Sequence, residues 1–111
     1  MKTTHNKLVR DNIPTIIKRA NKKCQTRILN DEDYIHYLKL KLLEESNEVN
    51  QANDNNKMIE ELADVFEVID ALLKTFDISL DVIKNIQSIK AKKNGQFNNK
   101  IFLEYVEDNN E

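Results

Sequence analysis

Residues that break helices are scarce in this chain of 111 residues. It contains a single glycine, Gly95, and a single proline, Pro14. Strands joined by tight hairpins usually need more turn-forming residues than this. The scarcity therefore argues against a hairpin-rich β fold and favours long helices, so we expect an all-α fold.

Cysteine is equally scarce. The single thiol, Cys24, cannot form an internal disulfide, and neither a second cysteine nor a histidine stands near it in the sequence to build a thiolate metal site. A free thiol is the ordinary state of such a residue in a reducing compartment.

Long apolar runs are missing. The charges at the N-terminus are not followed by the apolar stretch of a signal peptide. The longest apolar stretches are a few residues long, whereas a membrane helix needs about 20. We therefore expect a cytoplasmic protein that has no membrane partner.

Neither sign of charge dominates. The chain has 17 basic and 19 acidic residues, a net charge of −2. A general nucleic-acid binder would normally be basic with a clustered patch, so we expect no nucleic-acid partner. The length fits one domain. We expect that domain to cover residues 1–106 and a frayed acidic tail to cover residues 107–111.

The spacing of apolar residues predicts three sizeable helices after an irregular start. The first begins at residue 30 or 31 and ends near residue 53. The second covers about 56–76. The third is capped by Ser79 and ends near Gly95.

Four shorter segments are expected around these helices. Pro14 is suited to open a short helix in its first turn. Residues 21–23 resemble a turn and residues 26–29 an extended segment, while residues 101–106 are compatible with either a strand or a helix.

Two of the long helices have wide apolar faces, which a single chain of this size would leave partly uncovered. We expect a helical hairpin with flanking helices, forming a four-helix-type bundle that is completed by association into a homodimer or homotetramer.

Four acidic residues interrupt the apolar stripes of the first two long helices. At about 100° per residue, Glu45 and Glu48 lie within about 60° of each other, and Glu61 and Asp64 repeat this relation on the next helix. A short turn joins the two helices, so they should pack antiparallel with both pairs at one level. Carboxylates gathered in this way repel one another unless a hard cation such as Mg²⁺ neutralises them.

A solvated acidic face is the alternative that spacing alone leaves open. Glu44, Glu60 and Glu67 fit that ordinary interpretation better, because their angles place them off the edge of the apolar stripe. The other four are closer in phase with the apolar residues, which favours an inward-facing site.

Basic residues near these acids have two interpretations as well. Lys41 lies one turn before Glu44 and Glu45, where it can contact a phosphate or form a salt bridge. Lys92 and Lys93 end the last helix, where cations are favoured by the helix dipole whether or not they bind a substrate.

The sequence lacks the residues that three other kinds of functional site need. A glycine-rich phosphate loop cannot be built around one glycine. His5 and His36 are far apart and lack a Glu-x-x-His relation, which disfavours a di-iron bundle. Ser46 has acidic neighbours and no histidine to activate it.

The acidic residues resemble a known motif. Residues 44–48 (EESNE) followed by 61–64 (ELAD) are similar to the EExxE…ExxD pattern of the all-α NTP pyrophosphohydrolase superfamily, which includes MazG-like proteins, dimeric dUTPases and phosphoribosyl-ATP pyrophosphohydrolase. Residues 7–14 (KLVRDNIP) resemble the opening of a phosphoribosyl-ATP pyrophosphohydrolase-like, MazG-related branch. The likeness extends over most of residues 7–103.

The resemblance implies a nucleotide substrate, cleaved from triphosphate to monophosphate and pyrophosphate with Mg²⁺, for which Mn²⁺ can substitute. By resemblance the metal ligands are Glu45, Glu48, Glu61 and Asp64, and Arg10 and Lys41 match positions suited to phosphate contact. Either Glu44 or Glu45 is a candidate to accept a proton from the attacking water.

One segment departs from the branch. Relatives commonly end the last helix with a KxxRGGF-like stretch, and here residues 92–97 read KKNGQF. The arginine and one glycine are missing, which weakens the expectation that Lys92 and Lys93 belong to a substrate-binding segment.

Two alternatives remain at this point. One is phosphoribosyl-ATP pyrophosphohydrolase itself. The other is a helical interaction module with a vestigial metal site, which predicts no stabilisation by Mg²⁺.

Overall fold

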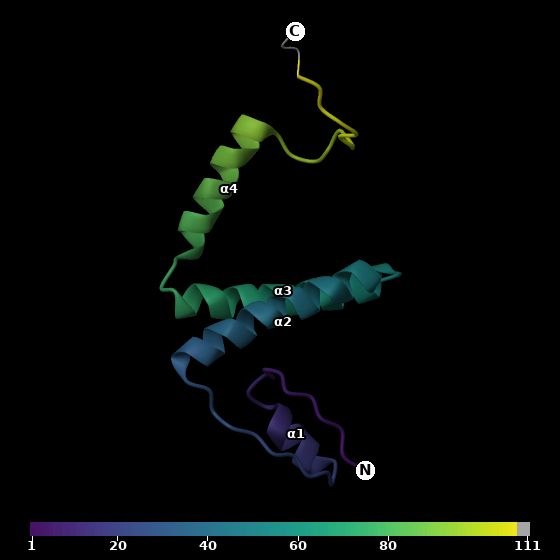
Figure 1. Ribbon diagram of the computed structural model, residues 1–111, viewed down its shortest axis with the longest axis vertical. Coiled ribbons are helices and arrows are strands. Elements are labelled where there is room, and N and C mark those ends of the chain that lie inside the picture. The colour runs from purple at the N-terminus through teal and green to yellow at the C-terminus, as the bar shows by residue number, and fades with distance from the viewer. Residues whose placement is uncertain (109–111) are drawn as a thin grey trace. The chain divides into compact units, whose positions relative to one another are not determined.

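The computed structural model describes residues 1–108, and all of the regular secondary structure within them is helical (Figure 1). Four helices follow one another along this part of the chain, and it contains no strand. Their bounds are α1 Ile13–Arg19, α2 Asp31–Gln51, α3 Asn55–Thr75 and α4 Leu80–Asn94. The expected all-α fold is confirmed. The predicted frayed tail extends into residues 109–111, which lie outside the described residues.

Capping side chains set the helix starts where the sequence predicted them. Asn30 Oδ1 accepts a hydrogen bond from the Asp33 amide at 2.8 Å, and Asp54 Oδ1 accepts one from the Lys57 amide at 2.8 Å. Ser79 Oγ does the same for α4 at 3.3 Å. Each bond satisfies an amide that has no partner inside its helix. The bounds of α2, α3 and α4 therefore agree with the sequence prediction to within about two residues.

Helices α2 and α3 form the predicted hairpin. Ala52, Asn53 and Asp54 connect them, and the two helices lie side by side (Figure 1). Leu38 of α2 and Val68 of α3 are the buried side chains of the described residues, at 3% and 7% exposure. The hairpin core is therefore thin, and most other apolar side chains of the two helices are partly exposed.

The segment before α2 belongs to the same compact unit, which covers Met1–Asp77. Pro14 lies in the first turn of α1, as predicted. Residues 20–21 form a turn, and residues 26–29 have no regular secondary structure. Lys7 and Arg10 tie this segment to the hairpin through ion pairs with Glu44 and Asp64.

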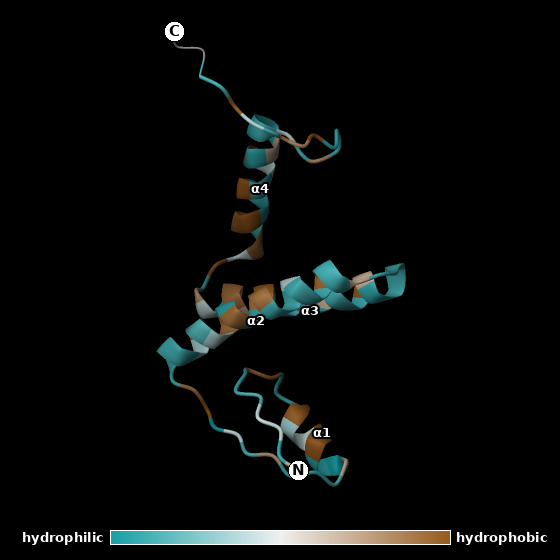
Figure 2. Cartoon of the chain, turned by 45° about the vertical axis from the view of Figure 1, so that its right-hand side comes forward, coloured by the Kyte–Doolittle hydropathy of each residue, from teal (hydrophilic) through white to brown (hydrophobic). Residues whose placement is uncertain are grey.

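A second compact unit begins at Ile78. It contains α4, which ends at Gly95 with a positive φ of 85°, a conformation that glycine adopts without strain. Apolar residues, brown in Figure 2, recur along the turns of α4. Residues 101–106, which were compatible with either a strand or a helix, adopt neither and are exposed.

No helix in the described part of the chain has both the length and the apolar character needed to cross a bilayer.

Candidate metal centre

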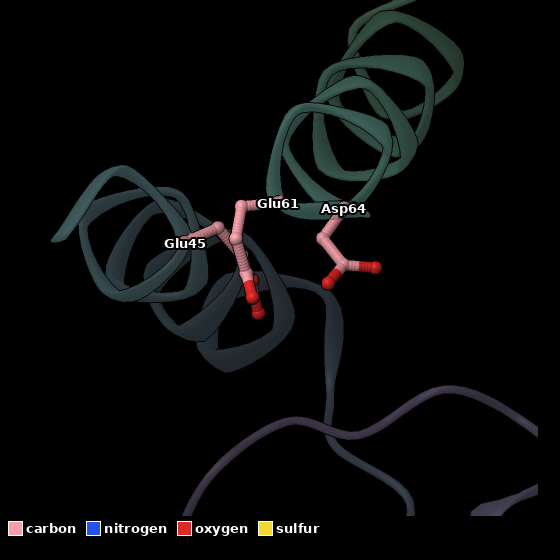
Figure 3. A group of neighbouring side chains, drawn as sticks. All are labelled: Glu45, Glu61 and Asp64. Atoms are coloured by element: carbon pink, nitrogen blue, oxygen red, sulfur yellow. The ribbon is translucent and has the colours of Figure 1, made fainter. Parts of the chain in front are cut away.

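Three of the predicted metal ligands come together between α2 and α3. One carboxylate oxygen from each of Glu45, Glu61 and Asp64 lies within 4.8 Å of the other two. Figure 3 shows Glu45 reaching from α2, and Glu61 and Asp64 from α3, toward the same space. We call these three residues the acidic cluster.

The buried pair of the hairpin explains why the cluster forms. Glu45 follows Leu38 by seven residues and Asp64 precedes Val68 by four, so each acid lies within about 40° of a buried residue on its helix. Packing Leu38 and Val68 inward therefore turns these acids toward the opposite helix. Glu45 is 12% exposed in its side chain, which is low for a carboxylate.

Glu48, the fourth predicted ligand, is exposed and stands outside the acidic cluster. It is still close enough to influence the cluster, because its negative charge is among the causes that raise the pKa of Glu61. The structure thus brings three of the four predicted ligands together and leaves Glu48 at the border.

The carboxylates of the acidic cluster repel one another. The pKa of the Glu61 carboxyl is raised, first by loss of hydration and then by the negative charges of Asp64, Glu48 and Glu45; Lys57 opposes these effects. A divalent cation would relieve this repulsion. Three carboxylate oxygens within 4.8 Å at a partly exposed site could hold a hard divalent cation, since such ions prefer oxygen ligands.

Basic side chains border the acidic cluster. Arg10 Nη2 donates to Asp64 Oδ1 at 2.6 Å. Lys41 Nζ lies 3.6 Å from Glu45 Oε1 and donates to Glu44 Oε2 at 3.2 Å. Two of the four cations predicted to contact phosphate, Arg10 and Lys41, therefore lie directly beside the candidate metal ligands.

Glu44 has a different environment from Glu45. It accepts hydrogen bonds from Lys7 at 2.9 Å and from Lys41 at 3.2 Å, and it lies outside the acidic cluster. The Lys7 hydrogen bond is the main cause that lowers the pKa of Glu44; burial opposes it and Lys41 adds to it. A carboxylate held ionised by two lysines is a weak base, so this environment is better suited to positioning Lys41 than to accepting a proton.

The sequence reasoning missed Lys7. The residue opens the KLVRD segment, so the signal was present, but nothing in the sequence showed that the segment crosses α2 at Glu44, 37 residues later. Lys92 and Lys93 lie exposed in the last turn of α4, in the second unit, and their predicted role stays a prediction.

A groove of about 560 Å³ runs along the hairpin, and two of the three residues of the acidic cluster, Glu45 and Asp64, line it. The segment before α1, α1 itself, α2 and α3 all contribute to its walls. Its lining residues are Leu8, Val9, Arg10, Asp11, Asn12, Ile13, Ile16, Tyr34, Leu38, Lys41, Glu45, Asp64, Glu67, Val68 and Ala71.

Comparisons with protein-family models, with curated proteins and with solved structures found no match to the chain.

Proposed function

We propose that the protein is a Mg²⁺-dependent nucleotide pyrophosphohydrolase that cleaves a nucleoside triphosphate to its monophosphate and pyrophosphate. One observation carries the proposal. Three carboxylates converge within 4.8 Å at one end of a groove, with Arg10 and Lys41 beside them. Carboxylates for a metal and cations for phosphates are the two ingredients that such a reaction needs. The resemblance to the EExxE…ExxD pattern supports the same function.

The proposal assigns some residues to the cation and others to the phosphates. Glu45, Glu61 and Asp64 hold the cation, and Glu48 contributes charge from the border of the site. Bound Mg²⁺ would supply charge neutralisation for the phosphates and a more acidic water. Arg10 and Lys41 bind phosphate oxygens, to which arginine can donate two parallel hydrogen bonds.

Glu45 is the better of the two candidates for taking the proton of the attacking water. It belongs to the acidic cluster, whereas both oxygens of Glu44 are engaged by lysines. Glu44 acts instead as a positioning residue, because it holds Lys41 and the segment around Lys7 in place.

A pyrophosphate-release screen tests the proposal. The wild-type protein would be assayed with Mg²⁺ or Mn²⁺ against ribo- and deoxynucleoside triphosphates, including damaged bases, and against phosphoribosyl-ATP. We expect turnover of at least one nucleotide and its loss, by a factor on the order of 100 or more, in Asp64→Asn. Asp70→Asn, an exposed change two turns along α3, is the matched control.

The screen also separates the alternatives. Turnover confined to phosphoribosyl-ATP would assign the enzyme to histidine biosynthesis. Release of pyrophosphate from no substrate, together with thermal melts that are identical in Mg²⁺ and EDTA, would contradict the proposal and leave the interaction module.

Self-association and a cytoplasmic location are part of the same proposal. Helix α3 exposes Ile59, Leu62 and Phe66, which recur on one of its faces, and α2 exposes Leu43 at 67%. Exposed apolar side chains that share a helix face often mark an interface. We propose a homodimer or homotetramer, and light scattering that gives a monomer mass would count against it.

A further inference from the structure

The groove changes its chemical character along its length. On α2 the lining residues Tyr34, Leu38, Lys41 and Glu45 recur at intervals of three or four, so they form one stripe. Eleven residues at 1.5 Å each give this stripe a length of about 16 Å. It begins with an aromatic and a buried aliphatic side chain and ends with an ion pair.

The antiparallel helix α3 repeats this gradient. Its lining residues, in order toward the turn of the hairpin, are Ala71, Val68, Glu67 and Asp64, so they also change from apolar to acidic. Leu38 and Val68 are the buried pair, so the apolar half of the groove lies on the hairpin core. Ile13 and Ile16, one turn apart on α1, add further apolar wall.

A ligand that fits this gradient is ionic at one end and flat and weakly hydrated at the other. Inorganic polyphosphate satisfies the ionic end alone and leaves the apolar half in contact with water. A nucleotide satisfies both ends, because its phosphates meet Arg10 and Lys41 while its base covers apolar wall. The volume of about 560 Å³ lies within the usual range for small-molecule sites.

Among the described residues that line the groove, Tyr34 is the one aromatic side chain. It stands eleven residues from Glu45 on the same face of α2 and is partly exposed, so its ring is available to a ligand. Aromatic rings bind nucleobases by stacking, a contact that every base can make.

We propose that the Tyr34 half of the groove is the nucleoside subsite and that Tyr34 is the residue on which the base stacks. This inference rests on the proposed function, since it places the triphosphate at the acidic cluster. It adds a prediction that the function alone does not make: affinity for the base depends on Tyr34, and affinity for the phosphates does not.

Calorimetric titration of the whole chain tests this. The probes are the α,β-methylene analogues of the deoxynucleoside triphosphates, which resist cleavage, and inorganic tripolyphosphate, all with Mg²⁺. We expect Tyr34→Ala to weaken binding of the preferred analogue on the order of tenfold and to leave tripolyphosphate binding unchanged. Tyr34→Phe should retain most of the affinity, because the ring is kept.

Tyr37→Ala is the matched control. Tyr37 lies one turn along α2, is also partly exposed, and does not line the groove. If Tyr34→Ala and Tyr37→Ala bind the preferred analogue equally well, or if Tyr34→Ala loses tripolyphosphate to the same degree, the subsite is wrong. A wild-type protein that binds every analogue no better than tripolyphosphate would overturn it as well.

The two proposals fail separately. Pyrophosphate release by the wild-type protein, measured in the same preparations, reports on the proposed function whatever Tyr34 does. If the wild-type protein releases pyrophosphate and Tyr34→Ala does not weaken binding of the analogue, the nucleoside subsite is contradicted and the proposed enzymatic function is not.

Discussion

The charge of Glu61 lowers the stability of the metal-free protein, although the same charge is needed for the proposed cation site. Its pKa is raised because it loses hydration and faces the negative charges of Asp64, Glu48 and Glu45. A raised pKa in the folded state means that folding favours the protonated carboxyl. The contribution of Glu61 to stability is therefore present at pH values below its unfolded pKa and is lost as the pH rises through its folded pKa.

Replacing that charge should stabilise the metal-free protein. We expect Glu61→Gln to raise the midpoint of thermal unfolding in EDTA at neutral pH, and to remove most of the stabilisation that Mg²⁺ gives the wild type. In the wild type this stabilisation should reach about 2.7 kcal/mol at a Mg²⁺ concentration 100 times its dissociation constant. Calorimetry with and without Mg²⁺ measures both effects.

Glu60→Gln provides the control for this prediction. Glu60 is the exposed neighbour of Glu61 and lies outside the acidic cluster. A variant of Glu61 that melts below the wild type in EDTA, or that responds to Mg²⁺ as strongly as Glu60→Gln, would show that the cluster is not a cation site.

The pKa of Glu44 is shifted in the opposite direction from the pKa of Glu61. Its pKa is lowered, mainly by the hydrogen bond from Lys7, so its contribution to stability is present above its unfolded pKa and is lost as the pH falls through its folded pKa. We expect Glu44→Gln to cost about 0.5 kcal/mol at pH 7, because partly exposed ion pairs contribute little. The difference from wild type should vanish in acid, where the protonated carboxyl of the wild type is as uncharged as the amide of the variant.

Glu44→Gln also tests its role as a positioning residue. Because Lys41 loses a partner while the acidic cluster is untouched, pyrophosphate release should fall several-fold and the response to Mg²⁺ should persist. Loss of the Mg²⁺ response in thermal melts would place Glu44 among the ligands instead.

The hairpin of α2 and α3 depends on very few fully buried side chains. Leu38 is 3% exposed and Val68 is 7% exposed. Removing one of two buried side chains leaves a cavity that their half-exposed neighbours fill only in part. The stability of this element and the direction of Glu45 and Asp64 therefore depend on the same pair.

We expect Leu38→Ala to destabilise the protein by about 2–5 kcal/mol, as for other buried leucines. Ile28→Ala, at a side chain that is 97% exposed, should change the stability by less than about 0.5 kcal/mol. Urea denaturation followed by circular dichroism compares the two. Equal losses would mean that Leu38 is not a core residue in solution.

The predictability of the elements follows from how local their signals are. The starts of α2 and α4 were predictable because Asn30 and Ser79 cap them within three residues of chain, whereas the Asp54 cap of α3 became visible only in the structure. The apolar residues 101–106 were ambiguous because a strand needs a partner strand, and none stands beside them within residues 1–108.

The candidate site was predictable where it depends on helical spacing and not where it depends on contacts between residues far apart in the sequence. Helical spacing placed Glu45, Glu61 and Asp64 on facing surfaces, and the structure brings them together. The contacts of Lys7 and Arg10 could not be read from spacing, since each joins residues 37 or 54 positions apart. Such contacts depend on the path of the first segment, which has no periodic pattern.

At the level of the whole molecule, much apolar surface remains uncovered. Leu62, Phe66 and Ile59 of α3 are 40–66% exposed, although they share one helix face. Surface of this kind in a small protein is usually covered by a partner, and a second copy of the chain is the partner we propose.

A polar substitution within this face should weaken self-association. We expect Phe66→Ser to lower the average mass in sedimentation equilibrium and to make the melting midpoint depend less on protein concentration, because the unfolding of a monomer is independent of concentration. Glu60→Ala, an exposed change about 100° around α3 from Ile59, should leave both unchanged. An unchanged average mass of Phe66→Ser would show that this face of α3 is not part of an interface between copies of the chain.

The walls of the groove are held by two kinds of force, and these respond differently to the solvent. The hairpin walls rest on apolar packing, whereas the first segment is tied on by partly exposed ion pairs, Lys7 to Glu44 and Arg10 to Asp64. The Debye length shrinks from about 8 Å at physiological ionic strength to about 3 Å at 1 M salt. Concentrated salt should therefore weaken the attachment of the first segment while α2 and α3 stay paired. The wall of the groove that the first segment forms should then open, and the walls formed by α2 and α3 should remain in place.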